Sequence, residues 1–312
     1  MNKLLLAALV SGAMAVPAFA ADYTIMAPAA PGGGWDQTAR SIQEALTAEG
    51  ISGNVQVTNV PGAGGTIGLA QFATQESGNA NALIVGGYVM VGAILTNASP
   101  VTLDNITPIA RLIGESDVIV VPANSELQSM DDLVAKLKAD PGSVSWAGGS
   151  AGGVDHIIAG LVAKAVGVDP TKVNYIAYSG GGEALAAVLG GQVTVGISGY
   201  GEFESQIAAG ELRALAMSGE NQMDGIPTLS ETGVDVTVEN WRMIAAAPDI
   251  TDEQKAAITA DIKKMAESAT WKSILETKGW VDMYLDGDAF DTQLAADIES
   301  TTTVLKDIGL VQ

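Results

Sequence analysis

One local pattern recurs four times along the chain of 312 residues and constrains its fold more than any other feature. Each copy consists of an extended apolar run, a cluster of glycines and a segment whose apolar residues have helical spacing. Strands that alternate with helices favour an α/β fold with largely parallel sheets. The spacing between the copies varies, so the pattern is not typical of a solenoid. The glycine clusters lie at residues 32–34, 62–65, 148–153 and 180–182.

The glycine clusters predict a site for an anion. In a turn from a strand to a helix, the first backbone N–H groups of the helix lack intrahelical acceptors, and the helix dipole favours negative charge there. Glycine allows a ligand to approach closely because it has no Cβ and tolerates positive φ. A single loop of this kind is better explained as a tight turn. Four of them, two within residues 22–121 and two within residues 122–241, favour loops that face one ligand-binding cleft.

The charge balance of the chain is strongly acidic. There are 15 Lys and Arg residues against 36 Asp and Glu residues, which gives a formal net charge of −21. Such a chain cannot supply the basic face that nucleic acid or an anionic membrane requires. Arginine occurs only at Arg40, Arg111, Arg213 and Arg242. Because side-chain cations are scarce, we expect backbone N–H groups to hold the anion.

The composition also excludes several kinds of site chemistry. The chain has no cysteine and one histidine, His156, which excludes disulfides, thiolate metal sites and multi-histidine metal sites. Ile67 and Leu185 stand where a dinucleotide fingerprint would need a small residue, and the Gly-Lys-Ser/Thr of a P-loop does not occur. We therefore expect neither a metal nor a cofactor.

One segment matches an enzyme motif. Residues 148–152 fit the G-x-S-x-G pattern of a serine hydrolase, with Ser150 as the nucleophile between a strand and a helix. Such a hydrolase needs a histidine far downstream of the serine, but His156 follows within the same predicted helix. We interpret His156 as a partly buried helix residue bonded to the backbone. We predict that the protein is not an enzyme, with an exported serine esterase using Ser150 as the remote alternative.

Residues 1–20 have the features of a cleaved signal peptide. Lys3 is followed by an apolar stretch too short to span a bilayer and by the cleavage pattern Ala18-Phe19-Ala20. The other long apolar run, residues 83–95, is interrupted by three glycines and is predicted to be a buried strand and loop. The sequence thus predicts an exported protein that does not insert into the membrane.

Two segments are predicted to connect two lobes. Residues 117–121 form a short β-branched run, residues 236–247 are extended and apolar, and a proline follows each segment. If both segments are crossings, residues 22–121 and 242–312 form the first lobe and residues 122–241 form the second. Two crossings of this kind would act as a hinge.

Four segments form a combination that is specific when they occur in this order. They are Pro31-Gly32-Gly33-Gly34-Trp35-Asp36, Asn59-Val60-Pro61-Gly62-Ala63-Gly64-Gly65, residues 148–156, and Tyr178-Ser179-Gly180-Gly181-Gly182-Glu183-Ala184-Leu185. With this combination, the chain resembles the periplasmic solute-binding proteins of tripartite tricarboxylate transporters, also called Bug receptors. The resemblance covers nearly the whole chain after residue 20. It implies the two-lobed fold of a type II periplasmic binding protein, a Venus flytrap of mostly parallel sheets flanked by helices.

The resemblance also implies the partners and the site. It implies a periplasmic location, a small carboxylate ligand, and a membrane permease with a large and a small subunit as the partner. Backbone amides of the first two glycine loops are expected to hold one carboxylate, and the second lobe a further anionic group. The matching positions in the first lobe are Gly32, Gly33, Gly34, Trp35, Gly62, Ala63, Gly64, Gly65 and Thr66. Those in the second lobe are Ser150, Ala151, Tyr178, Ser179 and Gly180.

Ser198 is a departure from the family pattern that bears on the ligand. Many members that bind dicarboxylates or amino acids have an acidic residue near this position. A hydroxyl there removes local repulsion towards a further negative group, although Glu202 can restore some negative charge. We therefore add Ser198 to the site and predict a small organic polycarboxylate, with a citrate-like tricarboxylate favoured. A dicarboxylate, an aromatic carboxylate or an acidic amino acid remains the alternative.

Overall fold

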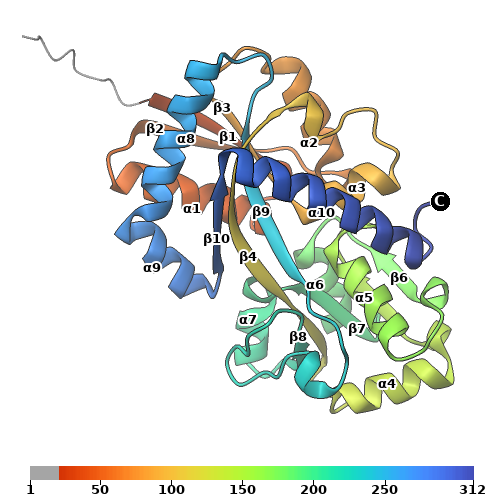
Figure 1. Cartoon of the computed structure of the whole chain (residues 1–312). Coiled ribbons are helices and arrows are strands. Elements are labelled where there is room, and N and C mark those ends of the chain that lie inside the picture. The colour runs from red at the N-terminus through yellow and green to blue at the C-terminus, as the bar shows by residue number, and fades with distance from the viewer. Residues whose placement is uncertain (1–20) are drawn as a thin grey trace, which may run out of the picture.

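The computed structural model describes residues 21–312, so the predicted signal peptide lies outside the described residues. Strands and helices alternate along most of this range (Figure 1). The strands are β1 (Ala21–Ala27), β2 (Ser52–Asn59), β3 (Ala82–Gly87), β4 (Thr107–Pro122), β5 (Ser145–Gly148), β6 (Asn174–Ala177), β7 (Val195–Gly199), β8 (Leu212–Met217), β9 (Glu239–Ala246) and β10 (Val281–Asp286). The helices are α1 (Gly34–Ala48), α2 (Thr66–Gln75), α3 (Tyr88–Thr96), α4 (Met130–Ala139), α5 (Val154–Ala165), α6 (Gly181–Leu189), α7 (Tyr200–Ala208), α8 (Asp252–Glu267), α9 (Ala269–Lys278) and α10 (Gly287–Asp307).

The strands form two sheets that share the long strand β4. The first sheet has the order β2-β1-β3-β9-β4-β10, and the second has the order β8-β4-β7-β5-β6. Pairing is parallel among β1, β2 and β3 and among β5, β6 and β7, where the glycine loops follow the strands. Every pairing of β4 or β9 is antiparallel. The α/β fold is confirmed, and the antiparallel role of these two strands was not predicted.

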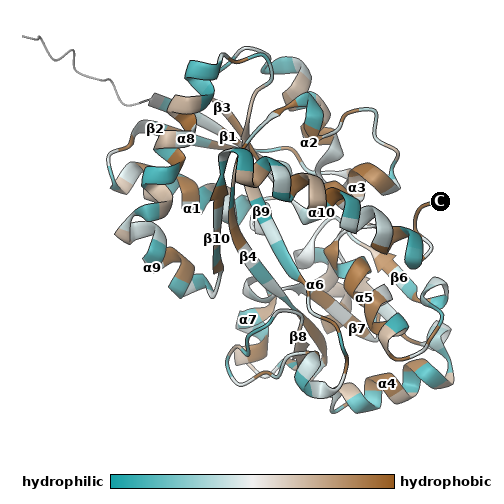
Figure 2. Cartoon of the chain, viewed as in Figure 1, coloured by the Kyte–Doolittle hydropathy of each residue, from teal (hydrophilic) through white to brown (hydrophobic). Residues whose placement is uncertain are grey.

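Each sheet is buried between apolar layers, as the residue pattern of β4 illustrates. Successive side chains of a strand point to opposite faces of its sheet. Val118 and Val120 pack into one apolar core, whereas Ile119 and Val121 pack into another on the opposite face. A third, larger core that includes Trp271 covers the first sheet. Figure 2 shows the result, with hydrophobic colour along β4 and a mixture of hydrophilic and hydrophobic colour on helices such as α4 and α10.

The sheets belong to two lobes, which are the upper and lower parts of the molecule in Figure 1. β4 pairs with β9 as far as Ser116 and with β7 from Asp117 onwards, so it passes from one sheet to the other. Residues 117–121 are therefore the last part of a strand of 16 residues. The second predicted crossing, residues 236–247, contains β9. The residues at which the lobes divide stay a prediction.

The predicted loop within residues 83–95 is wrong. β3 is followed directly by α3, and Gly87 at φ 152° makes the turn between them. Gly92 lies within α3 and does not interrupt it. A larger residue would not fit here, because a Cβ at this position would overlap the carbonyl oxygen of Gly152 in the other lobe. This glycine therefore permits close packing between the lobes. Among the residues from 21 onwards, no helix is both long enough and apolar enough to span a membrane.

Candidate ligand-binding site

A cavity of about 500 Å³ lies between the two lobes, a size typical of sites for small molecules. We call it the interlobe cavity. The first lobe lines it with residues 28–35, Gln37, Gly64 and Val89. The second lobe lines it with Gly149, Ser150, Asp155, residues 179–183, Ser198, Gly199, Gly201 and Glu202, and β9 adds Asn240 and Arg242.

Helices from both lobes begin at the interlobe cavity. They include α1 from the first lobe and α6 and α7 from the second, and Asp155 in the first turn of α5 also lines the cavity. The first N–H groups of a helix have no acceptor within the helix, and the helix dipole places partial positive charge on them. The residues in the first turns of α1, α6 and α7 that line the cavity are Gly34, Trp35, Gln37, Gly181, Gly182, Glu183, Gly201 and Glu202. Both lobes therefore present backbone donors that suit an anion.

The loop between β1 and α1 lines the cavity, but part of its donor capacity is used within the loop. The N–H of Gly32 donates to the Asp36 carboxylate at 2.8 Å, and the N–H of Gly33 donates to the Ala30 carbonyl at 3.1 Å. Burial favours a higher pKa for Asp36, but hydrogen bonds from Arg40, Gly32 and Asn59 outweigh it and lower that pKa. A charged Asp36 thus holds the loop in shape, and the first turn of α1 supplies the donors that remain.

The loop between β2 and α2 has an unusual backbone. Gly62, Ala63, Gly64 and Gly65 all have positive φ, at 129°, 47°, 60° and 86°. Only Gly64 lines the interlobe cavity, while Ala63 lines an adjoining hollow of about 330 Å³. The three predicted site residues that line neither space are Gly62, Gly65 and Thr66. A Cβ on Gly65 would overlap the Trp35 ring, so this glycine lets α1 and the loop pack together.

The two glycine loops of the second lobe lie on the opposite side of the interlobe cavity. The predicted residues that line the interlobe cavity are Ser150, Ser179, Gly180 and Ser198. Those that line only the adjoining hollow are Ala151 and Tyr178. The lobes touch here, because a Cβ on Gly64 would lie 3.2 Å from that of Ser150 and Thr96 donates to the Ala151 carbonyl at 3.3 Å.

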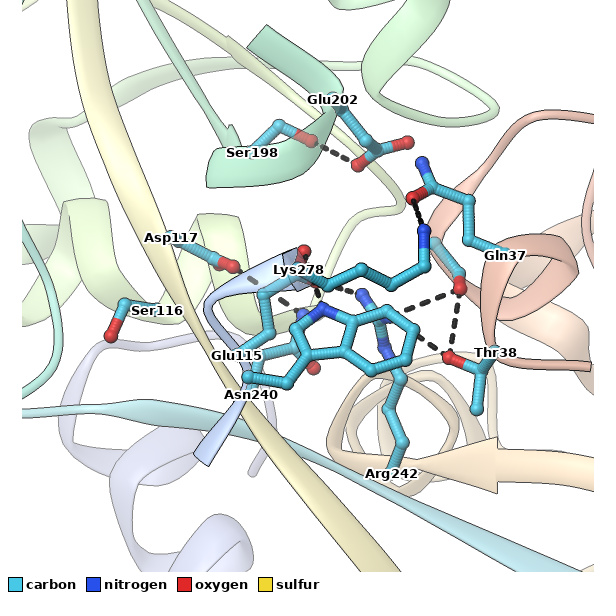
Figure 3. Close-up of polar contacts among 12 residues, drawn as sticks. Gln37, Thr38, Glu115, Ser116, Asp117, Ser198, Glu202, Asn240, Arg242 and Lys278 are labelled. Carbon is cyan, nitrogen blue, oxygen red and sulfur yellow. Dashed lines mark hydrogen bonds and ion pairs between the residues drawn. The ribbon is translucent and has the colours of Figure 1, made fainter. Parts of the chain in front are cut away.

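Arg242 is the one basic residue among residues 21–312 that lines the interlobe cavity. Its guanidinium forms an ion pair with Glu115, and it also donates to the Gly34 carbonyl and the Thr38 hydroxyl at 3.0 Å each (Figure 3). It also lies 5.6 Å from the centre of the Trp280 ring. The side chains of this ion pair are only 3% and 4% exposed. Arg242 thus joins α1 to β4, and its charge is compensated before any ligand arrives.

A cluster of acidic side chains lies beside this ion pair. Asp155 accepts a hydrogen bond of 2.5 Å from the N–H of Gly149, and Asp117 accepts one of 3.4 Å from Asn240. Burial raises the pKa of Asp117 well above its ordinary value, and the charges of Asp155 and Glu115 raise it further. Burial also raises the pKa of Asp155, against the effect of the Gly149 hydrogen bond. Burial and the neighbouring negative charges thus favour the protonated form of Asp117.

Glu202 brings a further carboxyl group directly to the cavity. It is the third residue of α7, and the Ser198 hydroxyl donates to its Oε2 atom at 2.6 Å. Burial, together with the charge of Glu115, raises the pKa of Glu202 to about 7. The position at which the sequence analysis expected a lost negative charge therefore has an acidic side chain against it.

The structure does not assemble a serine hydrolase at Ser150. The His156 Nδ1 atom accepts a hydrogen bond from the N–H of Gly152 at 3.3 Å, and its ring stacks on Tyr175 with 4.0 Å between centroids. Burial lowers the pKa of His156 to about 4. No hydrogen bond joins Ser150 to His156 in the part of the chain that the structure describes. The interpretation of His156 as a helix residue bonded to the backbone is confirmed.

Sequence reasoning missed Arg242, Asp155 and Asn240 as residues of the cavity wall. The available signal for Arg242 was its position within a strand that is otherwise apolar, since an isolated charge there requires a buried partner. Asp155 stands in the first turn of α5, where an acidic residue is common at the surface, so its sequence context does not distinguish it. These positions become notable only when β4, β9 and α5 meet.

The fold and the cavity together define a class of protein. Two lobes joined by long strands, with a cavity of ligand size between them and helix N-termini at its wall, are the features of a solute-binding protein. The chain belongs to the tripartite tricarboxylate transporter family of receptors, because the sequence model for that family receptor matches residues 38–310. The protein is accordingly a receptor and not an enzyme.

Several solved structures share this fold. The chain is similar to the periplasmic binding protein BugD, with 20% identity, 93% of this chain and 98% of that chain covered, and a TM-score of 0.80. It is similar to MatC from Rhodopseudomonas palustris with bound malate, with 20% identity, 94% and 97% covered, and a TM-score of 0.73. It is also similar to an R. palustris protein with adipate, with 21% identity, 92% and 97% covered, and a TM-score of 0.79.

Proposed function

We propose that this receptor binds a small organic polycarboxylate in the interlobe cavity and delivers it to a membrane permease with a large and a small subunit. The single observation that carries the proposal is the start of three helices, α1, α6 and α7, at one cavity. Their first-turn N–H groups stabilise a carboxylate by charge-assisted hydrogen bonds, each worth about 1.5–3 kcal/mol. Because Arg242 is already paired with Glu115, this backbone contribution dominates.

The proposed contacts follow from the cavity wall. We assign one carboxylate of the ligand to the first turn of α1 with its preceding loop, and a second one to the first turn of α6. Ser150 and Ser179 add hydroxyl groups that can donate to either carboxylate. The loop between β2 and α2 keeps its shape through Gly62, Gly65 and Thr66. These residues line neither the interlobe cavity nor the adjoining hollow, so we do not assign them a contact with the ligand.

The identity of the polycarboxylate is the finer part of the proposal. A citrate-like tricarboxylate is the first ligand to test, because Ser198 stands near the position where the resemblance implies an acidic residue in many members that bind dicarboxylates or amino acids. Malate and adipate are the matched dicarboxylates, as they are bound in neighbours of the same fold. Glu202 beside Ser198 favours a ligand that tolerates a carboxyl group at close range.

The cellular setting is also proposed. We place the protein in the periplasm after removal of residues 1–20. The lobes, residues 22–121 with 242–312 and residues 122–241, would close over the ligand by hinge motion in β4 and β9. The permease would then recognise the closed form.

Calorimetry of the mature protein tests the ligand class. Citrate, malate and adipate are titrated separately, with and without Mg²⁺, and acetate serves as a monocarboxylate control. Binding at a ligand concentration of ~100 times the dissociation constant should also raise the free energy of unfolding by ~2.7 kcal/mol. Failure of all three polycarboxylates to bind would refute the proposal, whereas binding of only a dicarboxylate would correct the ligand alone.

A further inference from the structure

The carboxyl group of Glu202 occupies an unusual place in the interlobe cavity. Ser198 donates to its Oε2 atom at 2.6 Å, whereas no donor among residues 21–312 bonds to its Oε1 atom. The Oε1 atom faces the first lobe, because a Cβ on Gly33 would lie 3.9 Å from it. Figure 3 shows Glu202 on the side of the cavity opposite α1, whose Gln37 side chain points towards it. One oxygen of this carboxyl group is thus free to meet a ligand.

Within residues 21–312, no ion pair joins Glu202 to a basic side chain. The charged groups around it are Glu115 from β4, Asp155 from α5 and Arg242 from β9, and Glu183 from α6 lines the same cavity. Arg242 is paired with Glu115. On the side of the first lobe, Gln37 bonds to Lys278 from α9 at 3.5 Å. Burial and the charge of Glu115 raise the pKa of Glu202 to about 7, so the acid and the carboxylate are both populated at neutral pH.

The start of α6, which is the position proposed for a ligand carboxylate, lies directly against the carboxyl group of Glu202. A Cβ on Gly181, the first residue of α6, would be 2.7 Å from the Glu202 Oε2 atom. A carboxylate held by the N–H groups of Gly181 and Gly182 would therefore be a near neighbour of Glu202. Two carboxylates at such short range cannot both remain ionised, and one of them takes up a proton.

We propose that Glu202 meets the ligand as a neutral carboxylic acid, so that the receptor captures its polycarboxylate together with one proton. The proton comes from solvent and stays on Glu202, whose Oε1–H group donates to a carboxylate oxygen of the ligand. The Ser198 hydroxyl holds the Oε2 atom and thereby orients the acid. This inference rests on the proposed function, since it requires an anionic ligand at the start of α6.

Uptake of a proton with the ligand determines whether the affinity rises or falls with pH. Below pH ~6, Glu202 already carries its proton in the free receptor. The affinity for the ligand then does not change with pH through this residue. Above pH ~7, the free receptor must be protonated on binding, so the affinity falls by about tenfold per pH unit at the limit. Between pH 7.5 and 8.5, the dissociation constant should rise about eightfold and the proton uptake should rise from about 0.8 to about 1.

Calorimetry with citrate tests this, with malate and adipate as further probes. Titrations at pH 7.5, 8.0 and 8.5 in phosphate and in Tris give the number of protons taken up, because the buffers differ in ionisation enthalpy. Citrate is almost fully ionised in this range, so it contributes little to the count. The wild-type receptor should take up close to one proton per ligand, and this result needs no variant.

Two variants assign the proton to its residue. Glu202→Gln keeps a donor at the same place without an ionisable group, so it should bind with no proton uptake and with a dissociation constant that changes less than about twofold over this pH range. Glu204→Gln, an exposed position on the same helix, should behave like the wild type.

The outcomes separate this inference from the proposed function. If none of the three probes binds, the proposed function fails and the inference fails with it. If a probe binds without proton uptake and with constant affinity, the inference alone is refuted. Loss of binding in Glu202→Gln, with no proton uptake in the wild type, would likewise refute the inference, because Glu202 would then contribute to binding without gaining a proton.

Discussion

An aspartate in place of Gly182 should strongly weaken ligand binding without weakening the fold. Gly182 is the second residue of α6 and lines the interlobe cavity, and a Cβ added there would meet no atom within 4 Å. Asp in the first turn of a helix stabilises it by about 0.3–1 kcal/mol. The Gly182→Asp variant should therefore unfold at the same temperature as the wild type or slightly higher.

The loss of affinity follows from the size of the cavity. A volume of about 500 Å³ corresponds to a sphere of radius about 5 Å, so a ligand at its centre lies about 5 Å from a charge on the wall. At an effective dielectric constant of about 20, two unit charges at this distance repel by about 3 kcal/mol. That energy weakens binding of a carboxylate roughly a hundredfold.

The control is Gly182→Asn, which has almost the same shape and no charge. Calorimetry of both variants with citrate, malate and adipate at pH 7.5 should show a strong loss for Gly182→Asp and a much smaller one for Gly182→Asn. Equal affinities of the two variants would refute the reasoning that an anion sits at the start of α6. If both variants had also lost affinity relative to the wild type, the space at this position would matter and the charge would not.

Two further predictions concern the fold around the site. Glu115→Ala leaves Arg242 buried without its partner, which should lower the free energy of unfolding by about 3–5 kcal/mol in urea, and a loss below ~1 kcal/mol would contradict a buried ion pair. Burial lowers the pKa of His156 to about 4, so the unfolded chain takes up this proton near pH 6.5 and the folded chain only near pH 4. Stability from a neutral His156 is therefore present above pH ~6.5 and is lost, by up to about 3 kcal/mol, as the pH falls to ~4. His156→Phe keeps an aromatic ring on Tyr175 and should remove this part of the pH dependence, whereas parallel unfolding curves for variant and wild type from pH 7 to 4 would exclude it.

The helix N-termini could be predicted because their signals are local. Glycines that follow an apolar run and precede helical spacing specify a turn between a strand and a helix from within a few residues. Thus α1 begins at Gly34 and α6 at Gly181, as the clusters at residues 32–34 and 180–182 indicate. The prediction of a loop within residues 83–95 was wrong because the role of Gly92 is not local. This glycine permits a contact between α3 and the other lobe.

The electrostatics of the cavity could not be predicted in the same way. Glu115 and Arg242 are 127 residues apart and pair only because β4 and β9 lie side by side in one register. Asp117 and Asp155 likewise come from different elements, β4 and α5. Their burial and mutual repulsion, which shift their pKa values, exist only after the elements have packed together.

The sequence by itself determined the α/β class, the positions of the glycine loops, the exclusion of cysteine chemistry and the acidic character of the protein. These properties follow from composition and short-range periodicity, which do not depend on how distant segments meet. Only the tertiary structure decided that Arg242 is neutralised by Glu115 and that Glu202 stands against the start of α6. Those properties depend on strand register and on the approach of two lobes, and no local pattern encodes either one.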